Sequence, residues 1–170
     1  GDSNIIISGG QENMSRSPHT IYFRLEKKLE KHRLVDSMIN DGLIDAFNNY
    51  HMGITAENVA QKFGISREEQ DKFAFESQRK TVAAQKNKVF DEEIIEVDLK
   101  NQKLFNKDEY PKVNQTIEDL KKLDPAFQEK GTVTAGNSSG LNDGAATIVL
   151  MRRDIAEKKN LNILGKIKNW

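Results

Sequence analysis

Gly131-Thr-Val-Thr-Ala-Gly-Asn-Ser-Ser-Gly-Leu-Asn-Asp-Gly-Ala-Ala-Thr-Ile-Val-Leu-Met151 is a loop of small and hydroxyl-bearing residues that runs directly into an apolar segment. Its four glycines allow positive φ angles and a close approach of the backbone to a ligand or to another strand. Residues 145–151 are apolar except for Thr147, which predicts a buried strand. A loop of this kind, opening onto a strand, is a place where a protein holds a substrate.

The composition narrows the class of protein. The 170 residues are long enough to bury a core and suit one domain or a large fragment of a longer chain. The formal net charge is zero, which argues against a general binder of nucleic acid or membrane surfaces. No apolar run approaches the length of a membrane span. Because the chain has no cysteine, it holds no disulfide, no thiolate metal site and no thiol nucleophile.

The N-terminal quarter combines a strand pattern with charged and helical patterns. Residues 4–8 contain three isoleucines before Gly9-Gly10, which predicts a buried strand ending in a tight turn. We expect a loop over 11–22. Residues 23–34 are dense in charge, typical of a solvated helix or arm, with a contact to a polyanion as the alternative. The apolar spacing over 35–47 predicts a helix interrupted near Gly42.

Local capping signals predict the remaining helices. Residues 55–63 suit a helix with Thr55 as N-cap and Gly64 as its end. Ser66-Arg-Glu-Glu69 is a capping box that opens a long helix to about residue 87. Two shorter helices are expected over 116–123 and 154–159. Alternation or apolar content predicts strands over 93–99 and 161–168, with a polar loop over 101–114.

Residues 56–73 also imitate a DNA-binding helix-turn-helix, with Ala60 and Gly64 at the right separation. A recognition helix presents basic or amide side chains to base edges. Here residues 66–76 carry two positive and four negative side chains, so phosphates would be repelled. Two packed structural helices account for the pattern, and nucleic-acid binding remains a remote alternative.

Five separate runs, in order along the chain, resemble the thiolase family, specifically the biosynthetic acetyl-CoA acetyltransferases. The resemblance covers essentially the whole chain, but less than half of a family member. The runs are Gly9-Gly-Gln-Glu-Asn-Met-Ser-Arg-Ser-Pro-His19, Asp41-Gly-Leu-Ile-Asp-Ala-Phe47, His51-Met-Gly-Ile-Thr-Ala-Glu-Asn58, Ser66-Arg-Glu-Glu-Gln-Asp-Lys-Phe-Ala74 and Gly131-Thr-Val-Thr-Ala-Gly-Asn-Ser-Ser-Gly-Leu-Asn-Asp-Gly144.

The resemblance implies an α/β fold: the end of the first βαβαβαββ half of a thiolase with its inserted α+β loop domain. Residues 1–14 would be the fourth strand and its turn, and 15–137 the loop domain. Residues 138–160 would hold the last strand and helix of that half. Residues 161–170 would begin the second half, so that both ends of the sequence suggest a piece of a longer protein. Strands 4–8 and 145–151 are then expected to pair in one sheet.

The resemblance also implies an activity. Thiolases transfer an acyl group between CoA thioesters, with coenzyme A or acetyl-CoA as substrate and no permanently bound cofactor. Their chemistry needs a nucleophilic cysteine, a second cysteine and an oxyanion hole. In the family these groups lie outside the segment that matches this chain. We therefore expect no catalytic residue, no metal site and no activity in the chain alone.

Ligand binding is what the resemblance carries over to individual residues. His51 resembles a histidine that lines the CoA pocket, Met52 a neighbour of the catalytic cleft, and Leu43 an apolar wall. Phe127 resembles an aromatic wall of the same tunnel, and Lys112 falls near the nucleotide end, where a cation could meet phosphate. The loop that contacts the pantetheine arm is matched by Ala135, Gly136 and Ser139.

The parent protein implied by the resemblance is a homo-oligomer in the cytoplasm, or in the mitochondrion of a eukaryote, with no nucleic-acid or membrane partner. A different interpretation is a non-catalytic remnant or split-gene product that keeps the fold. The cysteine content of a longer parent sequence would discriminate the two.

Overall fold

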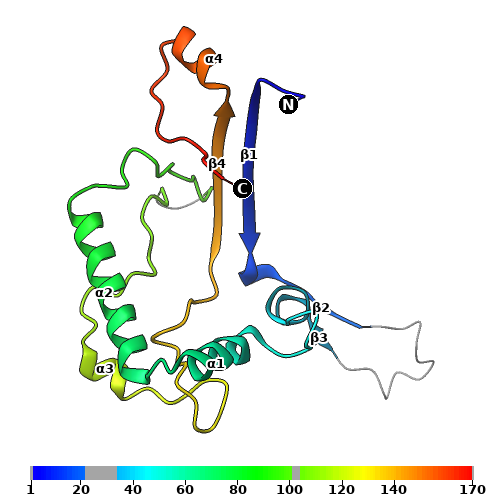
Figure 1. The fold of residues 1–170 in the computed structure, drawn as a ribbon, viewed down its shortest axis with the longest axis vertical. Coiled ribbons are helices and arrows are strands. Elements are labelled where there is room, and N and C mark those ends of the chain that lie inside the picture. The colour runs from blue at the N-terminus through cyan, green and yellow to red at the C-terminus, as the bar shows by residue number, and fades with distance from the viewer. Residues whose placement is uncertain (1, 22–33, 101–103, 170) are drawn as a thin grey trace. The chain divides into compact units, whose positions relative to one another are not determined.

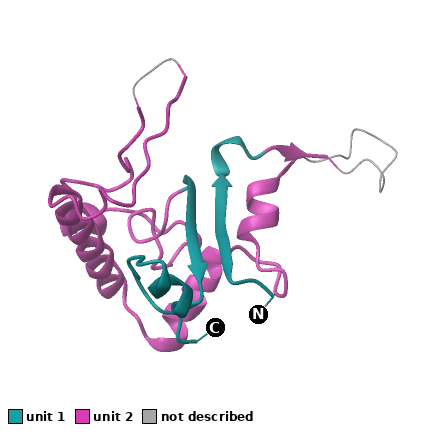
Figure 2. Cartoon of the chain, turned by 90° about the horizontal axis from the view of Figure 1, so that it is seen from above, with its two compact units in different colours: residues 1–17, 141–170 teal, residues 18–140 magenta. Residues whose placement is uncertain are grey.

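The computed structural model describes residues 2–21, 34–100 and 104–169 (Figure 1). The chain divides into two compact units, which are coloured separately in Figure 2. Unit 1 combines residues 1–17 with 141–170, and unit 2 is the stretch 18–140 inserted between them. The charged segment expected over 23–34 lies outside the described residues except for Leu34.

Unit 1 is built on a two-stranded ribbon. Strand β1 (Ile5–Asn13) pairs antiparallel with β4 (Asp143–Met151) along its whole length, from Ile5 opposite Met151 to Asn13 opposite Asp143. This confirms the expected pairing of two segments far apart in sequence. The short 3-10 helix η1 (Met14–Arg16) fixes the open end of the ribbon, because the Ser15 N–H donates to the Asp143 carboxylate at 2.9 Å. Helix α4 (Arg153–Lys158) follows β4.

Two expectations about this ribbon are wrong. The strands are not buried: Ile7 is 74% exposed and Val149 58%, because no layer of unit 1 packs on the ribbon among the described residues. Gly9-Gly10 also makes no turn, and the strand continues to Asn13. Gly9 lies so close to the paired strand that a Cβ there would overlap the carbonyl oxygen of Ala146. Close strand approach, rather than a turn, is the reason for glycine at this position.

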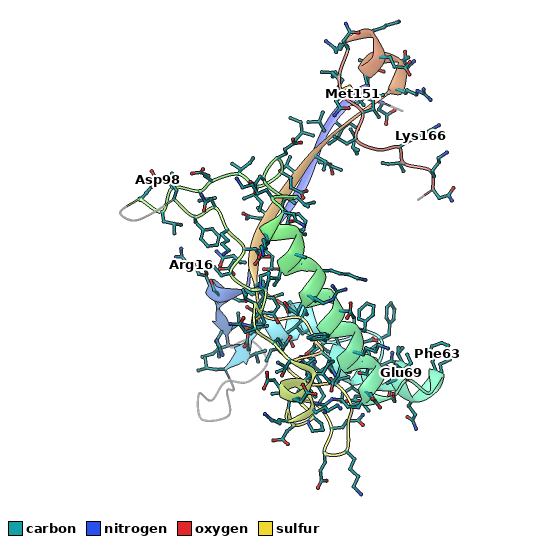
Figure 3. The ribbon with its side chains drawn as sticks, turned by 90° about the vertical axis from the view of Figure 1, so that its left-hand side faces the viewer. Arg16, Phe63, Glu69, Asp98, Met151 and Lys166 are labelled. Atoms are coloured by element: carbon teal, nitrogen blue, oxygen red, sulfur yellow. The ribbon has the colours of Figure 1, made fainter. Side chains whose placement is uncertain are left out.

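Unit 2 contains the two long helices, α1 (Met52–Phe63) and α2 (Arg67–Lys86). Phe63 and Glu69 lie at the junction between them (Figure 3). Gly64 ends α1 in the left-handed conformation, with φ of 64°, as the sequence predicts. The capping box between Ser66 and Glu69 is confirmed, with the Ser66 N–H donating to the Glu69 carboxylate at 2.8 Å.

The start of α1 differs from the prediction. The helix begins at Met52, one turn before the position that a Thr55 cap requires. His51 is the N-cap, and its Nδ1 accepts a hydrogen bond from the Gly53 N–H at 2.9 Å. An imidazole nitrogen thus performs the task that the sequence pattern assigned to a hydroxyl. The short helix α3 (Ile117–Lys121) is capped by Thr116, in agreement with the expected helix over 116–123.

Residues 11–22 and 35–47 are more structured, and differently structured, than predicted. The short strands β2 (His19–Thr20) and β3 (Val35–Asp36) pair antiparallel, and the π-helix η3 (Met38–Leu43) replaces the expected α-helix. The strand expected over 93–99 is reduced to one bridge, between Val97 and Phe105. The described part of 161–168 forms no strand. A strand is stable only when another strand pairs with it. Residues 93–99 have one bridging residue and 161–168 have no strand partner among the described residues.

The core of unit 2 is small and half polar. Its most buried residues come from α1, α2, α3 and the loop that begins at Gly131. Apolar and polar side chains take equal parts in it: Ala60, Leu120 and Val133 are buried beside Glu57, Asp71 and Thr134. Buried polar groups must be hydrogen-bonded, so this core depends on its polar contacts as much as on its apolar ones.

Candidate functional site

The glycine-rich loop is held at its beginning by a buried carboxylate. Glu57, on the inner face of α1, is 6% exposed. It accepts hydrogen bonds from the N–H groups of Thr132 and Val133, both at 2.8 Å, and from the Thr132 hydroxyl at 2.8 Å. The preceding Gly131 packs directly on this carboxylate, and a Cβ there would overlap it. Glycine is therefore needed at the start of the loop for contact with α1.

The environment of Glu57 keeps it ionised. Burial raises the pKa of this carboxyl, but the hydrogen bonds from Val133 and Thr132 outweigh that effect and lower the pKa below its usual value of 4.5. Three donors converge on two oxygens that carry a full negative charge, so these bonds are charge-assisted.

We expect acid to weaken this anchor. Because the folded-state pKa of Glu57 is depressed, its stabilising contribution is present above about pH 4.5 and is lost as the pH falls through the lowered value. Urea unfolding at several pH values gives the free energy of unfolding of the wild type and of Glu57→Gln. The difference in free energy between the two proteins should shrink as the pH falls. A difference that stays constant with pH would show that Glu57 contributes nothing to the pH dependence.

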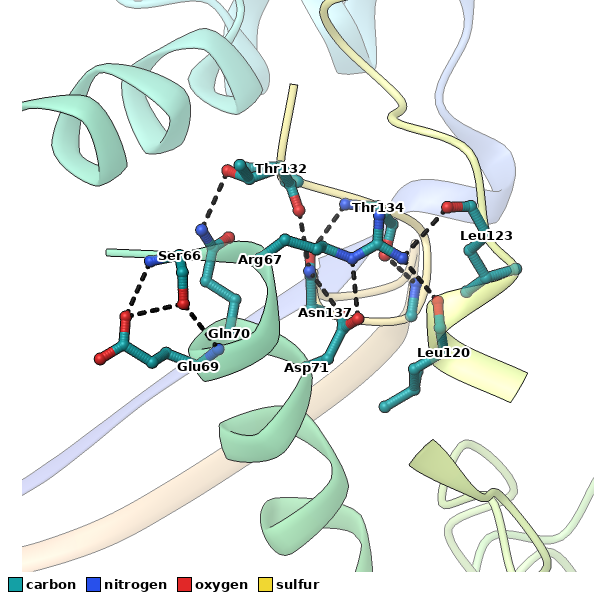
Figure 4. A network of polar contacts seen from close by, with 12 residues as sticks. Ser66, Arg67, Glu69, Gln70, Asp71, Leu120, Leu123, Thr132, Thr134 and Asn137 are labelled. Atoms are coloured by element: carbon teal, nitrogen blue, oxygen red, sulfur yellow. Dashed lines mark hydrogen bonds and ion pairs between the residues drawn. The ribbon is translucent and has the colours of Figure 1, made fainter. Parts of the chain in front are cut away.

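A second network holds the end of the loop (Figure 4). The Asn137 side chain donates to the Asp71 carboxylate at 2.9 Å and to the Thr132 carbonyl at 3.0 Å. Its own oxygen accepts from the Thr134 N–H at 2.8 Å. Asp71 is 1% exposed and pairs with Arg67 at 2.8 Å, and the Arg67 guanidinium also donates to the carbonyls of Leu120 and Leu123. One network thus joins α2, α3 and the loop.

The inner bonds of the loop complete its shape. The Thr134 hydroxyl accepts from the Gly136 N–H at 3.2 Å, and the Thr134 carbonyl accepts from the Asn137 N–H at 3.3 Å and from the Ser138 hydroxyl. The amides of Thr132, Val133, Thr134, Gly136 and Asn137 therefore all have protein acceptors. A loop with its amides bound in this way is preorganised and loses little conformational entropy when it binds a ligand.

An aromatic pair lies at the start of α1. The rings of His51 and Phe127 stack with their centroids 4.8 Å apart. Gly53 lies directly under the Phe127 ring, and a Cβ there would overlap it. The segment just before Phe127 pairs with the loop, with the Ala126 N–H donating to the Val133 carbonyl at 2.9 Å and a bridge between Pro125 and Thr134. The stacked pair and the loop are thus neighbours, joined through α1 and through this backbone contact.

The remaining predicted site residues vary in their positions. Ala135 and Ser139 are exposed on the loop, whereas Gly136 packs against Leu120 and Leu123, which leave no room for a Cβ. Packing against α3, and not contact with a ligand, therefore explains why residue 136 is a glycine. Leu43 ends η3 and is half-buried, and Met52 is 54% exposed at the first position of α1.

Lys112 lies in a different part of unit 2. Its N–H donates to the side chain of Gln78 at 2.9 Å, in the middle of α2, and its ammonium lies 5.3 Å from the centre of the Tyr110 ring. Within the described ranges 2–21, 34–100 and 104–169, no hydrogen bond or ring contact links it to His51, Phe127 or the loop. The structure therefore brings together the stacked pair and the loop, and leaves Lys112 apart from them.

The residues that shape the loop were not singled out in the sequence. Glu57 lies on the buried face of α1 with Gly53 and Ala60, a spacing of four and three residues that marks one side of a helix. A glutamate that shares a helix face with two small residues is therefore a sequence signal for a buried acid. Arg67 and Asp71 have the four-residue spacing of a helical ion pair, which gives no hint that Asp71 is buried.

The first turn of α2 is unsuited to reading DNA, because Arg67 and Gln70 are engaged within the protein. Gln70 donates to the Thr132 hydroxyl at 2.9 Å, and Arg67 binds α3. In the described part of the chain, no group of three acidic or histidine side chains is placed to hold a metal ion. Nor do the described helices include one with the length and apolar character to cross a membrane.

Comparison with known proteins places this geometry in a family. Residues 1–154 match the model of the thiolase N-terminal domain. The chain is 49% identical over 173 residues to an acetyl-CoA acetyltransferase of Paracoccus denitrificans, covering all of this chain and 44% of that protein. It is 50% identical over 175 residues to a probable acetyl-CoA acyltransferase of Staphylococcus aureus, again covering 44% of the relative. The chain thus spans less than half the length of these relatives.

Comparison with solved structures leads to the same family. The acetyl-CoA acetyltransferase of Syntrophomonas wolfei superposes with a TM-score of 0.85 at 39% identity, over 94% of this chain and 40% of that one. Human mitochondrial 3-ketoacyl-CoA thiolase in complex with CoA gives a TM-score of 0.84 at 38% identity, with the same coverage. The mixed α/β fold described above is part of the thiolase fold. The chain therefore belongs to the thiolase family, and its residues 1–154 are part of the N-terminal domain of that family.

Proposed function

We propose that this chain is part of an acetyl-CoA C-acetyltransferase, which transfers an acyl group between CoA thioesters, and that its role there is to bind coenzyme A. The proposal rests on the structure of the loop that begins at Gly131. The loop is fixed by Glu57 and Asn137, and it lies beside the stacked rings of His51 and Phe127. A solved relative with the same fold is in complex with CoA.

In this proposal the chain's own residues bind and orient the ligand. Ser139 and Ala135, exposed on the loop, face the pantetheine arm, and His51 with Phe127 forms an aromatic wall. Leu43 and Met52 add apolar surface, and Lys112 meets phosphate at the nucleotide end. Residues 15–137 correspond to the loop domain of a thiolase. The complete protein is a homo-oligomer in the cytoplasm or mitochondrion.

Chemistry needs groups that this chain does not contain. The nucleophile of the proposed reaction is a thiol, and the sequence holds no cysteine. We expect the purified 170-residue chain to show no thiolysis of acetoacetyl-CoA in the presence of CoA, measured by loss of the enolate absorbance. Thiolysis above the uncatalysed rate would contradict this assignment of roles.

Neighbouring serines provide a matched test of the binding proposal. The Ser139 hydroxyl is exposed and makes no hydrogen bond to a residue that the structure describes, so Ser139→Ala should leave the melting temperature unchanged. The loss of one ligand hydrogen bond should weaken CoA binding about fivefold, as measured by calorimetric titration.

Ser138→Ala is the control, because Ser138 donates to the Thr134 carbonyl within the loop. It should lower the melting temperature more than Ser139→Ala does. If Ser139→Ala lowered the melting temperature and left CoA affinity unchanged, the serine would be structural and its place in the site wrong.

A further inference from the structure

We infer that Glu57 is a positioning residue for the coenzyme A site: from one helix it sets the place of the loop relative to the His51–Phe127 pair, without contacting the ligand. The inference rests on the proposed function, since it concerns the same site. It follows from three features of α1 and of the loop.

The first feature is that α1 carries both halves of the site. His51 caps the helix, Gly53 supports the Phe127 ring, and Glu57 binds the amides of Thr132 and Val133. Gly53 and Glu57 are four residues apart, about 6 Å along the axis and on the same side of the helix. A helix is stiff over one turn. The separation between the aromatic pair and the start of the loop is therefore set by α1.

The second feature is the chemistry of the side chain. Two N–H groups and one hydroxyl converge on Glu57, which requires a group that only accepts hydrogen bonds. An apolar side chain would pack against the helix as Ala60 does, but would leave buried donors without partners. A glutamine keeps the size, yet it offers one oxygen and turns a donor toward the loop. The carboxylate therefore serves the loop backbone and is not needed for helix packing.

The third feature is a second anchor of the loop, on another helix. Asn137 holds Thr134 and the end of the loop through Asp71, on another helix. Asn137 also donates to the Thr132 carbonyl, and Gln70 donates to the Thr132 hydroxyl. Loss of the Glu57 carboxylate should thus free the N–H groups of Thr132 and Val133 while the rest of the loop stays in place. A local displacement of this kind changes ligand affinity without unfolding the unit, which separates positioning from general stabilisation.

The test compares two glutamate-to-glutamine variants of the full 170-residue chain. Glu57→Gln removes the buried carboxylate, and Glu129→Gln makes the same change at an exposed position near the loop. Coenzyme A affinity is measured by calorimetric titration well below the melting temperature. Amide hydrogen exchange is followed at Thr132, Val133 and Asn137.

We expect Glu57→Gln to weaken CoA binding about tenfold, because bonds to a charged acceptor are lost at the loop. The amides of Thr132 and Val133 should exchange faster, and that of Asn137 should stay protected. Glu129→Gln should match the wild type in both measurements. If Glu57→Gln exchanged faster at Thr132 and Val133 but bound CoA as tightly as the wild type, the positioning role would be wrong. If exchange at these two amides were unchanged, Glu57 would not anchor the loop.

Failure of the proposed function would look different. A wild-type chain that binds no CoA contradicts that function and the positioning role together, whatever the exchange rates are. Binding by the wild type with equal affinity in Glu57→Gln contradicts the positioning role alone. Exchange at Thr132 and Val133 reports the anchor in both cases.

Discussion

Replacing Asp71 with alanine is expected to lower the free energy of unfolding of unit 2 by about 3 kcal/mol. Asp71 is 1% exposed and accepts from Arg67 at 2.8 Å and from Asn137 at 2.9 Å. Its removal leaves one charged and one neutral donor facing a buried void. Arg67 is a quarter exposed and keeps its bonds to the Leu120 and Leu123 carbonyls, so the loss falls at the low end for broken buried pairs. Urea denaturation measures it.

A second ion pair on the same helix provides the control. Glu76 and Arg79 are 2.7 Å apart, but their side chains are 38% and 59% exposed, so Glu76→Ala should change stability far less. If the two variants lost similar amounts, burial of Asp71 would not be the cause. The Asp71 variant should also loosen the loop at Asn137, which the Glu76 variant should leave unchanged.

Gly53→Ala is expected to destabilise unit 2 by about 2 kcal/mol, although alanine is the better helix former. A methyl group at this position overlaps three atoms of the Phe127 ring. Overpacking of this kind costs about 3 kcal/mol, whereas the gain from replacing a helical glycine is about 1 kcal/mol. The cost of the steric overlap exceeds the gain in helix propensity, and the displaced ring also loses its stacking on His51. Thermal unfolding by circular dichroism measures the net effect.

Gly42→Ala is the matched substitution, because Gly42 lies in η3 of the same unit and a methyl group added there would have no neighbouring atom within 4 Å. It should be neutral or slightly stabilising. A Gly53→Ala protein as stable as Gly42→Ala would mean that Phe127 moves aside at no cost, and that the stacked pair is not fixed by α1.

Local signals in the sequence were enough for the junction between α1 and α2. The Ser66–Glu69 capping box and the glycine at position 64 act through bonds within a few residues, so the pattern contains the whole cause. The start of α1 was predicted wrongly because two capping groups competed. The imidazole of His51 caps an earlier turn, and Thr55 lies inside the helix, where its buried hydroxyl has no hydrogen-bond partner among the described residues.

Burial of strands could not be predicted from their apolar content. Residues 4–8 and 145–151 are apolar and do pair, but exposure depends on what covers the ribbon, and no segment described in unit 1 does so. The same argument applies to residues 93–99, whose alternation suits a strand that finds only one bridging partner. Alternating apolar residues show that a segment favours a strand, but the strand forms only where a partner strand is present.

The site was predicted unevenly. Its ligand-facing residues came from the resemblance to thiolases, and their roles stay predictions. The residues that shape it act over long sequence separations: Glu57 meets Val133, and Asp71 meets Asn137, across more than sixty residues each. No local pattern encodes such contacts. What the sequence does contain is a buried-face glutamate on α1 and a loop whose amides need acceptors.

The most direct test of the account is a map of amide chemical shifts in the full chain as coenzyme A is added. Coenzyme A is expected to cause saturable shifts at His51, at Phe127 and along residues 132–139. Saturation without shifts in the loop, or the absence of any binding at millimolar CoA, where even weak complexes of about 1 mM are detected, would contradict the assignment of this unit as a coenzyme A site.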